Sequence, residues 1–453
     1  MSLRARSAPR AAPEVAPIGR RAARQGRPPL LVPTADLGGV LVIGFATAVG
    51  MWAIGYLCRL PGAAVPAPLI FVGMIGCMLL GGAFAGRTCG RGVRSGLAAG
   101  VVTGLVNLLI LGSLLGDGRA QAILSAELAR AALLWAPASI AIAAACGGIG
   151  ARLGAQTRAA GRGVSVNWPA HFAWVATVAT LLLIPVGGIV TGYQAGLAVP
   201  DWPGSYGYNM FLYPLARMTG GIYFEHAHRL FGALVGLTTL ALTVYLQLVE
   251  PRGWVRALAW VVLLAVVVQG VLGGLRVTEQ NLPLAVVHGV LAQVFLATVG
   301  SLCVFLSRAW QVEQPTATAA AVLERRLGLA ALAALLVQLI LGAVLRHTAW
   351  GLWPHIAMAG VVLLALGAFA LRCWGIYEQH PVIARMGAVV LGLLGTQFLL
   401  GFAALVAVLD ESSRQTITAA HVAVTTLHQA LGAVLLAAAA ALVLLQRRLA
   451  RVS

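Results

Sequence analysis

The chain contains no lysine and little charge of either sign. Of its 453 residues only 10% are charged and 60% are apolar, and all 31 basic residues are arginine. A soluble globular chain carries about a quarter charged residues, so this shortage excludes an ordinary water-soluble enzyme. The 13 acidic residues leave a formal net charge of +18. The arginines gather in loops on one side of the apolar segments, which predicts a membrane protein with both termini in the cytoplasm and no nucleic-acid partner.

Cysteine is scarce, and a cleavable leader is not evident. No two of the six cysteines share an expected outer loop, so no structural disulfide is expected. The N-terminal residues lack the apolar core of a signal peptide. They are rich in arginine, alanine and proline, which predicts a disordered cytoplasmic tail over 1–35.

Long apolar segments occupy most of the remaining chain. Twelve are long enough to cross a bilayer core of about 30 Å at about 1.5 Å per residue. They are expected at about 37–57, 66–86, 95–115, 129–150, 170–192, 226–248, 256–275, 284–306, 327–346, 353–371, 386–408 and 417–445. The predicted class is an all-α polytopic protein of the cell inner (cytoplasmic) membrane, with the lipid bilayer as a partner.

The last eight segments form two repeats of four. HRLFGALVGLTTL, from His228, aligns with HIAMAGVVLLALG, from His355, and the sequence around His288 aligns with that around His428. This duplication predicts two pseudo-symmetric four-helix bundles with equivalent sites. The expected divisions are a four-helix membrane domain at 36–150, a linker at 151–167, a first bundle at 168–310 and a second bundle at 311–453.

Four histidines lie at equal depth near the expected outer ends of their segments: His228, His288, His355 and His428. About 20 residues, or roughly 30 Å of helix, separate each from a charge expected at the cytoplasmic face. A histidine in a membrane segment is costly unless it has a partner. Two pairs at one depth therefore predict two metal-cofactor sites, with haem favoured. Nearby glycines would let a flat macrocycle approach or would serve helix packing: Gly232, Gly289, Gly360 and Gly432.

The last of the four ligands has a competitor. His421 lies seven residues before His428, on the same helical face. The distance to Arg447 favours His428, and His421 would lie about 10 Å farther out. His421 would then line the access route or bond a propionate, but the sequence alone leaves both choices open. His226 is interpreted as a boundary residue.

A carboxylate and an arginine flank the first histidine in YFEHAHRLFG. Glu225 and His228 share a helical face, where a carboxylate can orient a ring or a substrate, or move protons. Arg229 lies where a haem propionate would emerge and could anchor it. The alternative is a helix-start glutamate beside an arginine that reaches the interface. Arg276 and Arg346 on the outer side suggest further anionic partners, or simple surface placement.

A family resemblance rests on several of these motifs together. GGIVTGYQAGLAVPDWPGSYGYNMF at 187–211, followed by FEHAHRLFG, QGVLGGLRV and VVHGVLAQ, resembles heme A synthase. The resemblance covers about 167–447, and GLAVPDWP together with E-x-x-H-R is its specific part. The first four helices resemble no family and are interpreted as an extra domain for stability, assembly or docking.

The resemblance implies an oxidoreductase that converts a methyl group of heme O to a formyl group, giving heme A for cytochrome oxidase. It implies substrate haem between His228 and His288, with Glu225 at the reaction centre. It implies a heme b cofactor between His355 and His428. The implied partners are an electron donor of unknown kind, heme O synthase, cytochrome oxidase assembly factors and a second copy of the chain.

Two departures from the family pattern and two alternatives accompany this reading. The loop at 193–222 lacks the cysteine pair that some members carry, and Ile356 follows His355 where an arginine follows His228. A di-haem cytochrome b that carries electrons from quinol would use the same histidine pairs, as would a haem transporter or chaperone. The long loop and E-x-x-H-R favour the synthase, because histidine ligation alone requires neither.

Overall fold

The computed structural model describes residues 34–115, 126–156, 166–318, 321–377, 379–409 and 416–451. Within these ranges, twelve helices are long and apolar enough to cross a membrane. The predicted all-α polytopic fold is confirmed. Of the tail expected over 1–35, residues 1–33 lie outside the described residues, as do residues 157–165 of the linker expected over 151–167. The domain boundaries stay predictions.

The first four helices are α1 (Thr34–Cys58), α2 (Ala67–Thr88), α3 (Val93–Leu115) and α4 (Ala126–Gln156). Helices α2 and α3 both pack closely against α4, since a Cβ at Gly82 or Gly96 would overlap its backbone at Gly147. Small residues allow this approach where no hydrophobic force drives helices together in lipid. Helix α4 continues past the expected boundary at 150, because Ala151 is still packed against α2 at Gly86.

The next four helices close into a ring. They are α5 (Trp168–Gly192), α6 (Gly220–Val249), α7 (Gly253–Thr278) and α8 (Leu282–Leu306), each in contact with the next, and α5 contacts α8. Asparagine caps begin α5 and α8: Asn167 accepts from the Ala170 amide and Asn281 from the Leu284 amide. A proline early in each helix fits a position that needs no amide donor.

A long loop, residues 193–219, joins α5 to α6. It contains the antiparallel strands β1 (Gly204–Ser205) and β2 (Tyr208–Asn209), then the 3-10 turns η1 (Met210–Leu212) and η2 (Leu215–Arg217). Tyr206 and Gly207, between the strands, both have positive φ, at 53° and 76°. Two such residues suit a two-residue hairpin turn. We call the end of the helices that carries this loop the loop face.

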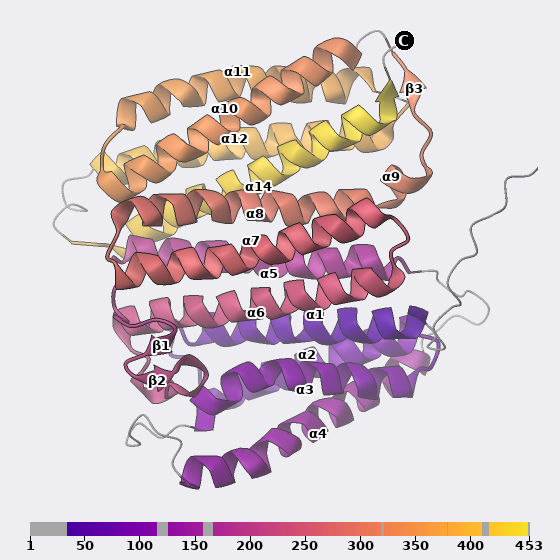
Figure 1. The fold of residues 1–453 in the computed structure, drawn as a ribbon, viewed down its shortest axis with the longest axis vertical. Helices are drawn as coiled ribbons and strands as arrows, with labels where there is room; N and C mark the ends of the chain where they lie inside the picture. Colours follow the sequence, from indigo (N-terminus) through magenta and orange to yellow (C-terminus); the bar gives the residue numbers. More distant parts are fainter. Residues whose placement is uncertain are drawn as a thin grey trace, which may run out of the picture. The chain divides into compact units, whose positions relative to one another are not determined.

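The last four long helices close into a second ring. They are α10 (Ala321–Thr348), α11 (Leu352–Ile376), α12 (Pro381–Leu409) and α14 (Ala419–Leu449). The short helix α9 (Arg308–Val312) and strand β3 (Thr316–Ala317) lead into them, and β3 pairs in parallel with β4 (Ala450–Arg451). Helix α14 contacts α5 and α8, so the first bundle lies between the first four helices and the second bundle (Figure 1).

Candidate functional site

The four histidines meet in two pairs of nearly identical geometry. His228 of α6 faces His288 of α8, with ring centres 6.4 Å apart and ring planes at 87°. His355 of α11 faces His428 of α14, also at 6.4 Å and at 82°. We call these the first pair and the second pair. Their equivalence follows from the duplication, since α6 and α8 in one ring correspond to α11 and α14 in the other.

A glycine on the preceding helix seats each of the four imidazoles. A Cβ built at that glycine would lie 2.9 to 3.3 Å from Cε1 of the ring, closer than comfortable carbon contact. The seats are Gly187 for His228, Gly273 for His288, Gly342 for His355 and Gly401 for His428. Any larger residue at these positions would push the ring away, so the glycines set the separation within each pair.

Three of the seats follow a glutamine by one helical turn, in Gln269, Gln338 and Gln397. The side-chain nitrogen of Gln338 lies 3.3 Å from Nε2 of His355. The same glutamines offer main-chain hydrogen bonds to three of the imidazoles, Gln269 to His288, Gln338 to His355 and Gln397 to His428. Among the described residues, Nδ1 of His228 and both side-chain amide atoms of Gln269 are buried without a hydrogen-bond partner. Buried polar atoms in a membrane interior are costly when unpaired. Both pairs therefore resemble sites built to receive a polar or metal-bearing group.

The separation within each pair fits a haem iron. Two metal–nitrogen bonds of about 2.0 Å, plus about 1.1 Å from each nitrogen to its ring centre, span about 6.2 Å. The observed 6.4 Å agrees with this sum. A Cβ at Gly232 or Gly360 would meet nothing within 4 Å, so the helix surface beside the histidines admits a flat ring. Two imidazoles would fill only two coordination positions of an iron ion, and a macrocycle would supply the others.

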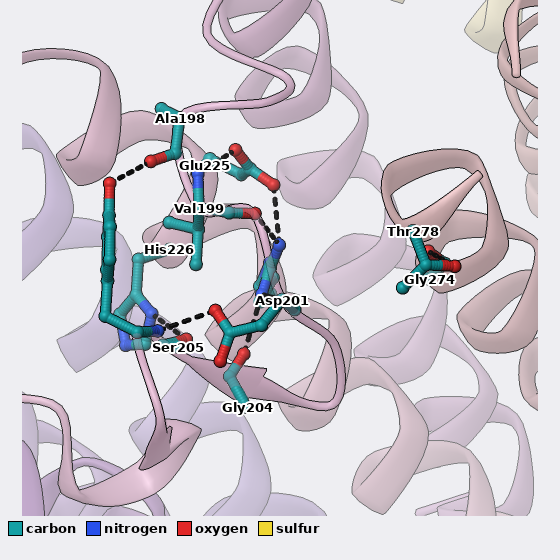
Figure 2. A network of polar contacts seen from close by, with 11 residues as sticks. Ala198, Val199, Asp201, Gly204, Ser205, Glu225, His226, Gly274 and Thr278 are labelled. Carbon is teal, nitrogen blue, oxygen red and sulfur yellow. Dashed lines mark hydrogen bonds and ion pairs between the residues drawn. The ribbon is translucent and has the colours of Figure 1, made fainter. Parts of the chain in front are cut away.

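The long loop is fastened to α6 beside the first pair (Figure 2). Glu225, which is 3% exposed, accepts a hydrogen bond of 2.8 Å from the Val199 amide and forms a 2.7 Å ion pair with Arg229. The Arg229 guanidinium also donates to the main-chain carbonyls of Val199, Asp201 and Gly204, at 2.6 to 2.8 Å. The expected carboxylate and arginine therefore join the loop to the helix, and Arg229 faces loop carbonyls.

His226 belongs to the same fastening, which the sequence did not reveal. It is fully buried, and its Nδ1 lies 3.0 Å from the Ser205 hydroxyl (Figure 2). Its ring also packs against Tyr213, with centres 4.9 Å apart. His226 is therefore a buried part of the contact between the loop and α6, because the loop folds back and covers the start of the helix. Its position at the membrane boundary stays a prediction. His226 lies two residues before His228, and the sequence offers no separate signal for its contact with the loop.

Asp201 shapes the hairpin within the loop. Its carboxylate accepts hydrogen bonds from the amides of Tyr206, at 2.6 Å, and Gly207, at 2.9 Å. Burial raises the pKa of this carboxyl, but the amide bonds and the Arg229 charge outweigh it, so the pKa lies below its ordinary value. The ionised carboxylate therefore stabilises the loop at neutral pH.

The loop also reaches across α7. A Cβ at Gly274 would overlap the Trp202 indole, and Gly274 follows Gly273, which seats His288. A side chain at Gly196 would overlap the Arg276 guanidinium. The loop thus contacts α7 as well as α6, the two helices that flank the first pair. Arg276 of α7 is covered by the loop at Gly196, near the loop face.

A polar seam joins the two bundles near the same face. Arg346 of α10 donates a 2.8 Å hydrogen bond to the Gly188 carbonyl of α5. A Cβ at Gly188 would lie 3.3 Å from Thr426 Oγ1 and 3.4 Å from Gln429 Oε1 on α14. Among the described residues, these two oxygens and Arg346 Nε are buried without partners. Gly188 follows Gly187, which seats His228, and Gln429 follows His428. The seam therefore lies next to both histidine pairs.

His421 takes no part in either pair. Its Nδ1 lies 3.1 Å from the Ala407 carbonyl of α12, and its amide is capped by Thr418. His428, two turns deeper on α14, is the residue that faces His355. The arrangement favours His428 over His421, although the role of either as a ligand stays a prediction.

The fold and the site together define a polytopic membrane protein with two equivalent histidine pairs set between facing helices. Residues 170–354 match the family model described as cytochrome oxidase assembly protein, COX15-CtaA. This part of the chain is similar to that family, in agreement with the resemblance, and the family description connects it with cytochrome oxidase assembly. The match includes the long loop and the first pair and ends immediately before His355. No curated protein matches the chain.

Proposed function

We propose that the chain is a heme A synthase, which oxidises a methyl group of heme O to the formyl group of heme A. The observation that carries the proposal is the first pair at 6.4 Å beneath a loop that Glu225 and Arg229 fasten. Histidine pairs alone would suit many haem proteins. A loop that bears the family motif and is fastened beside the first pair suits a substrate site, since it can exclude water and orient the ring.

His228 and His288 would hold the substrate haem, and Gly187 and Gly273 would set the reach of their rings. Glu225 lies one turn from His228, and its carboxyl group is held between Arg229 and the Val199 amide. From there it would position the reacting edge of the ring or accept a proton. Arg229 would keep this carboxylate in place. It could bind a haem propionate only if it gave up some of its hydrogen bonds to the loop carbonyls.

His355 and His428 would hold heme b, which would provide electron transfer toward the substrate haem. The pair has the same separation and the same glycine seats as the first. Arg276 beneath the loop and Arg346 in the seam would bind haem propionates, since both are cations near the loop face. Propionate oxygens at the seam would satisfy Arg346 Nε, one of its unpartnered atoms.

The protein would lie in the cell inner membrane with the loop face outside and the termini in the cytoplasm. The arginine-rich ends opposite the loop face support this orientation. Heme O synthase, an electron donor, cytochrome oxidase assembly factors and a second copy of the chain are the partners expected of such an enzyme.

The test is to co-express the chain with a source of heme O and to identify the extracted haems by mass. Heme A or its hydroxylated intermediate is the expected result in the wild type. His228→Ala should abolish product, while His421→Ala, its control on a residue outside both pairs, should retain it. Unaltered heme O bound to the wild-type protein would reject the synthase and favour a carrier or transporter.

A further inference from the structure

The first four helices have no counterpart in the duplicated bundles, yet they pack on the part of the protein that holds the first pair. Their contacts with the rest of the chain include α1 with α5 and α6, and α3 with α6 and η1. Helix α6 carries His228, and η1 lies in the long loop. The extra helices therefore reach both components of the first site.

On α6, residues before Glu225 and after His228 contact the first four helices. Tyr223 lies two residues before Glu225, and its hydroxyl donates a 2.7 Å hydrogen bond to the carbonyl of Tyr56 at the end of α1. The two tyrosine rings also stack, with centres 5.6 Å apart and planes at 13°. Three residues after His228, Phe231 packs edge-on against Trp52, at 5.7 Å.

The Trp52 and Phe231 side chains are buried, and α3 supports Trp52 from the opposite side. Trp52 and Phe231 are 6% and 5% exposed, and the Trp52 indole donates a 3.0 Å hydrogen bond to Asn107 of α3. A shift of α6 along or around its axis would break the aromatic contacts and the tyrosine bond together. Close-packed interiors resist such shifts, because neighbouring side chains cannot follow.

On the loop, the end of α3 grips η1. Ser113 is fully buried and donates a 3.3 Å hydrogen bond to the Phe211 carbonyl. A Cβ at Gly112 would lie 2.5 Å from the same carbonyl oxygen and from Leu212, so the backbones meet closely there. η1 directly follows the hairpin whose residues bind Arg229 and His226. The loop is thus held from two sides, by α6 and by α3.

We propose that the first four helices are a positioning brace for the first site, with Tyr223, Tyr56 and Ser113 as positioning residues. The brace sets the long loop and the register of α6, and so the placement of Glu225 and His228, but leaves the second pair unaffected. The part of the proposal that concerns haem rests on the proposed function; the part that concerns the loop does not.

The test compares the full-length double variant Tyr223→Phe, Ser113→Ala with the wild type. Tyr245→Phe is the matched control, because Tyr245 lies at the other end of the same α1–α6 contact, against Gly38 and far from the loop. Two readouts are taken: amide hydrogen exchange of residues 199–212, and haem titration with spectra assigned to each pair by His228→Ala and His355→Ala.

We expect faster exchange in the loop and about 3- to 10-fold weaker haem binding at the first pair in the double variant. The second pair and the Tyr245→Phe protein should match the wild type. Equal weakening of both pairs, or unchanged loop exchange, would overturn the brace. If the wild type bound no haem while the double variant still exchanged faster in the loop, the brace would stand and the proposed function would fail.

Discussion

Replacing Gly187 by alanine tests the glycine seats directly. The added Cβ would lie 2.9 Å from Cε1 of His228, whereas carbon atoms pack best at about 3.5 to 4.0 Å. The imidazole must therefore retreat by roughly 0.6 to 1 Å, because α5 is itself held between α6, α8 and α14. A displacement of that size at a metal ligand costs about 10- to 100-fold in affinity.

The assay is haem titration of the solubilised protein, followed by the absorption and EPR spectra of bis-imidazole haem. Gly187→Ala should weaken the first pair about 10- to 100-fold and spare the second. Gly342→Ala should do the reverse, since its Cβ would stand 2.9 Å from Cε1 of His355. Gly76→Ala is the control, because Gly76 lies in α2, outside both bundles, and its Cβ would meet nothing within 4 Å.

Helix propensity alone predicts the opposite outcome. Alanine in place of glycine inside a helix is worth about 0.5 to 1 kcal/mol of added stability. If Gly187→Ala bound haem at the first pair as tightly as wild type and merely melted at a higher temperature, the seat reasoning would be refuted. The same would hold if Gly76→Ala weakened binding as much as Gly187→Ala.

Further predictions concern the loop fastening and the second pair. Glu225→Ala should stall formyl production while haem still binds, and should loosen the loop because it leaves the buried Arg229 charge unpaired; full conversion by this variant would remove Glu225 from the mechanism. Asp201→Asn should lower the thermal midpoint most above about pH 5, with the gap to wild type closing toward pH 3, because a carboxyl with a lowered folded pKa stabilises only while it is ionised; a gap independent of pH would contradict this. His355→Ala should eliminate haem binding at the second pair alone, as judged by haem content and spectra, and an equal loss in His421→Ala would show that the pairing at 6.4 Å is not the ligand set.

Much of the architecture could be predicted from the apolar pattern. Runs long enough to span a bilayer are read from composition alone, and the repeat that relates His228 to His355 predicts equivalent bundles. Each predicted pair lies face to face because ring closure brings α6 to α8 and α11 to α14. The glycine seats were missed, although glutamine four residues before glycine recurs at Gln269, Gln338 and Gln397. Attention to residues near the histidines in sequence pointed instead to Gly232, whose Cβ would meet open space.

The loop was the least predictable part. Its motif could be recognised, but not that Arg229 would bind three of its carbonyls or that His226 would hold Ser205. Such contacts depend on how an irregular segment folds back over a helix. The periodicity of apolar residues in the sequence does not predict the course of such a segment. The packing of Tyr56 on Tyr223 was equally hidden, since it joins helices more than 160 residues apart.

The sequence by itself determined the membrane class, the duplicated bundles and the depth of the four histidines, because hydrophobic length and charge bias act locally along the chain. Only the tertiary structure decided that His428 rather than His421 faces His355, that Glu225 and Arg229 fasten the loop, and that the extra helices pack against α6 and the loop. The physical reason is that these outcomes depend on which backbones approach within a few ångströms. That approach is set by packing between distant segments and by the small residues at their crossings.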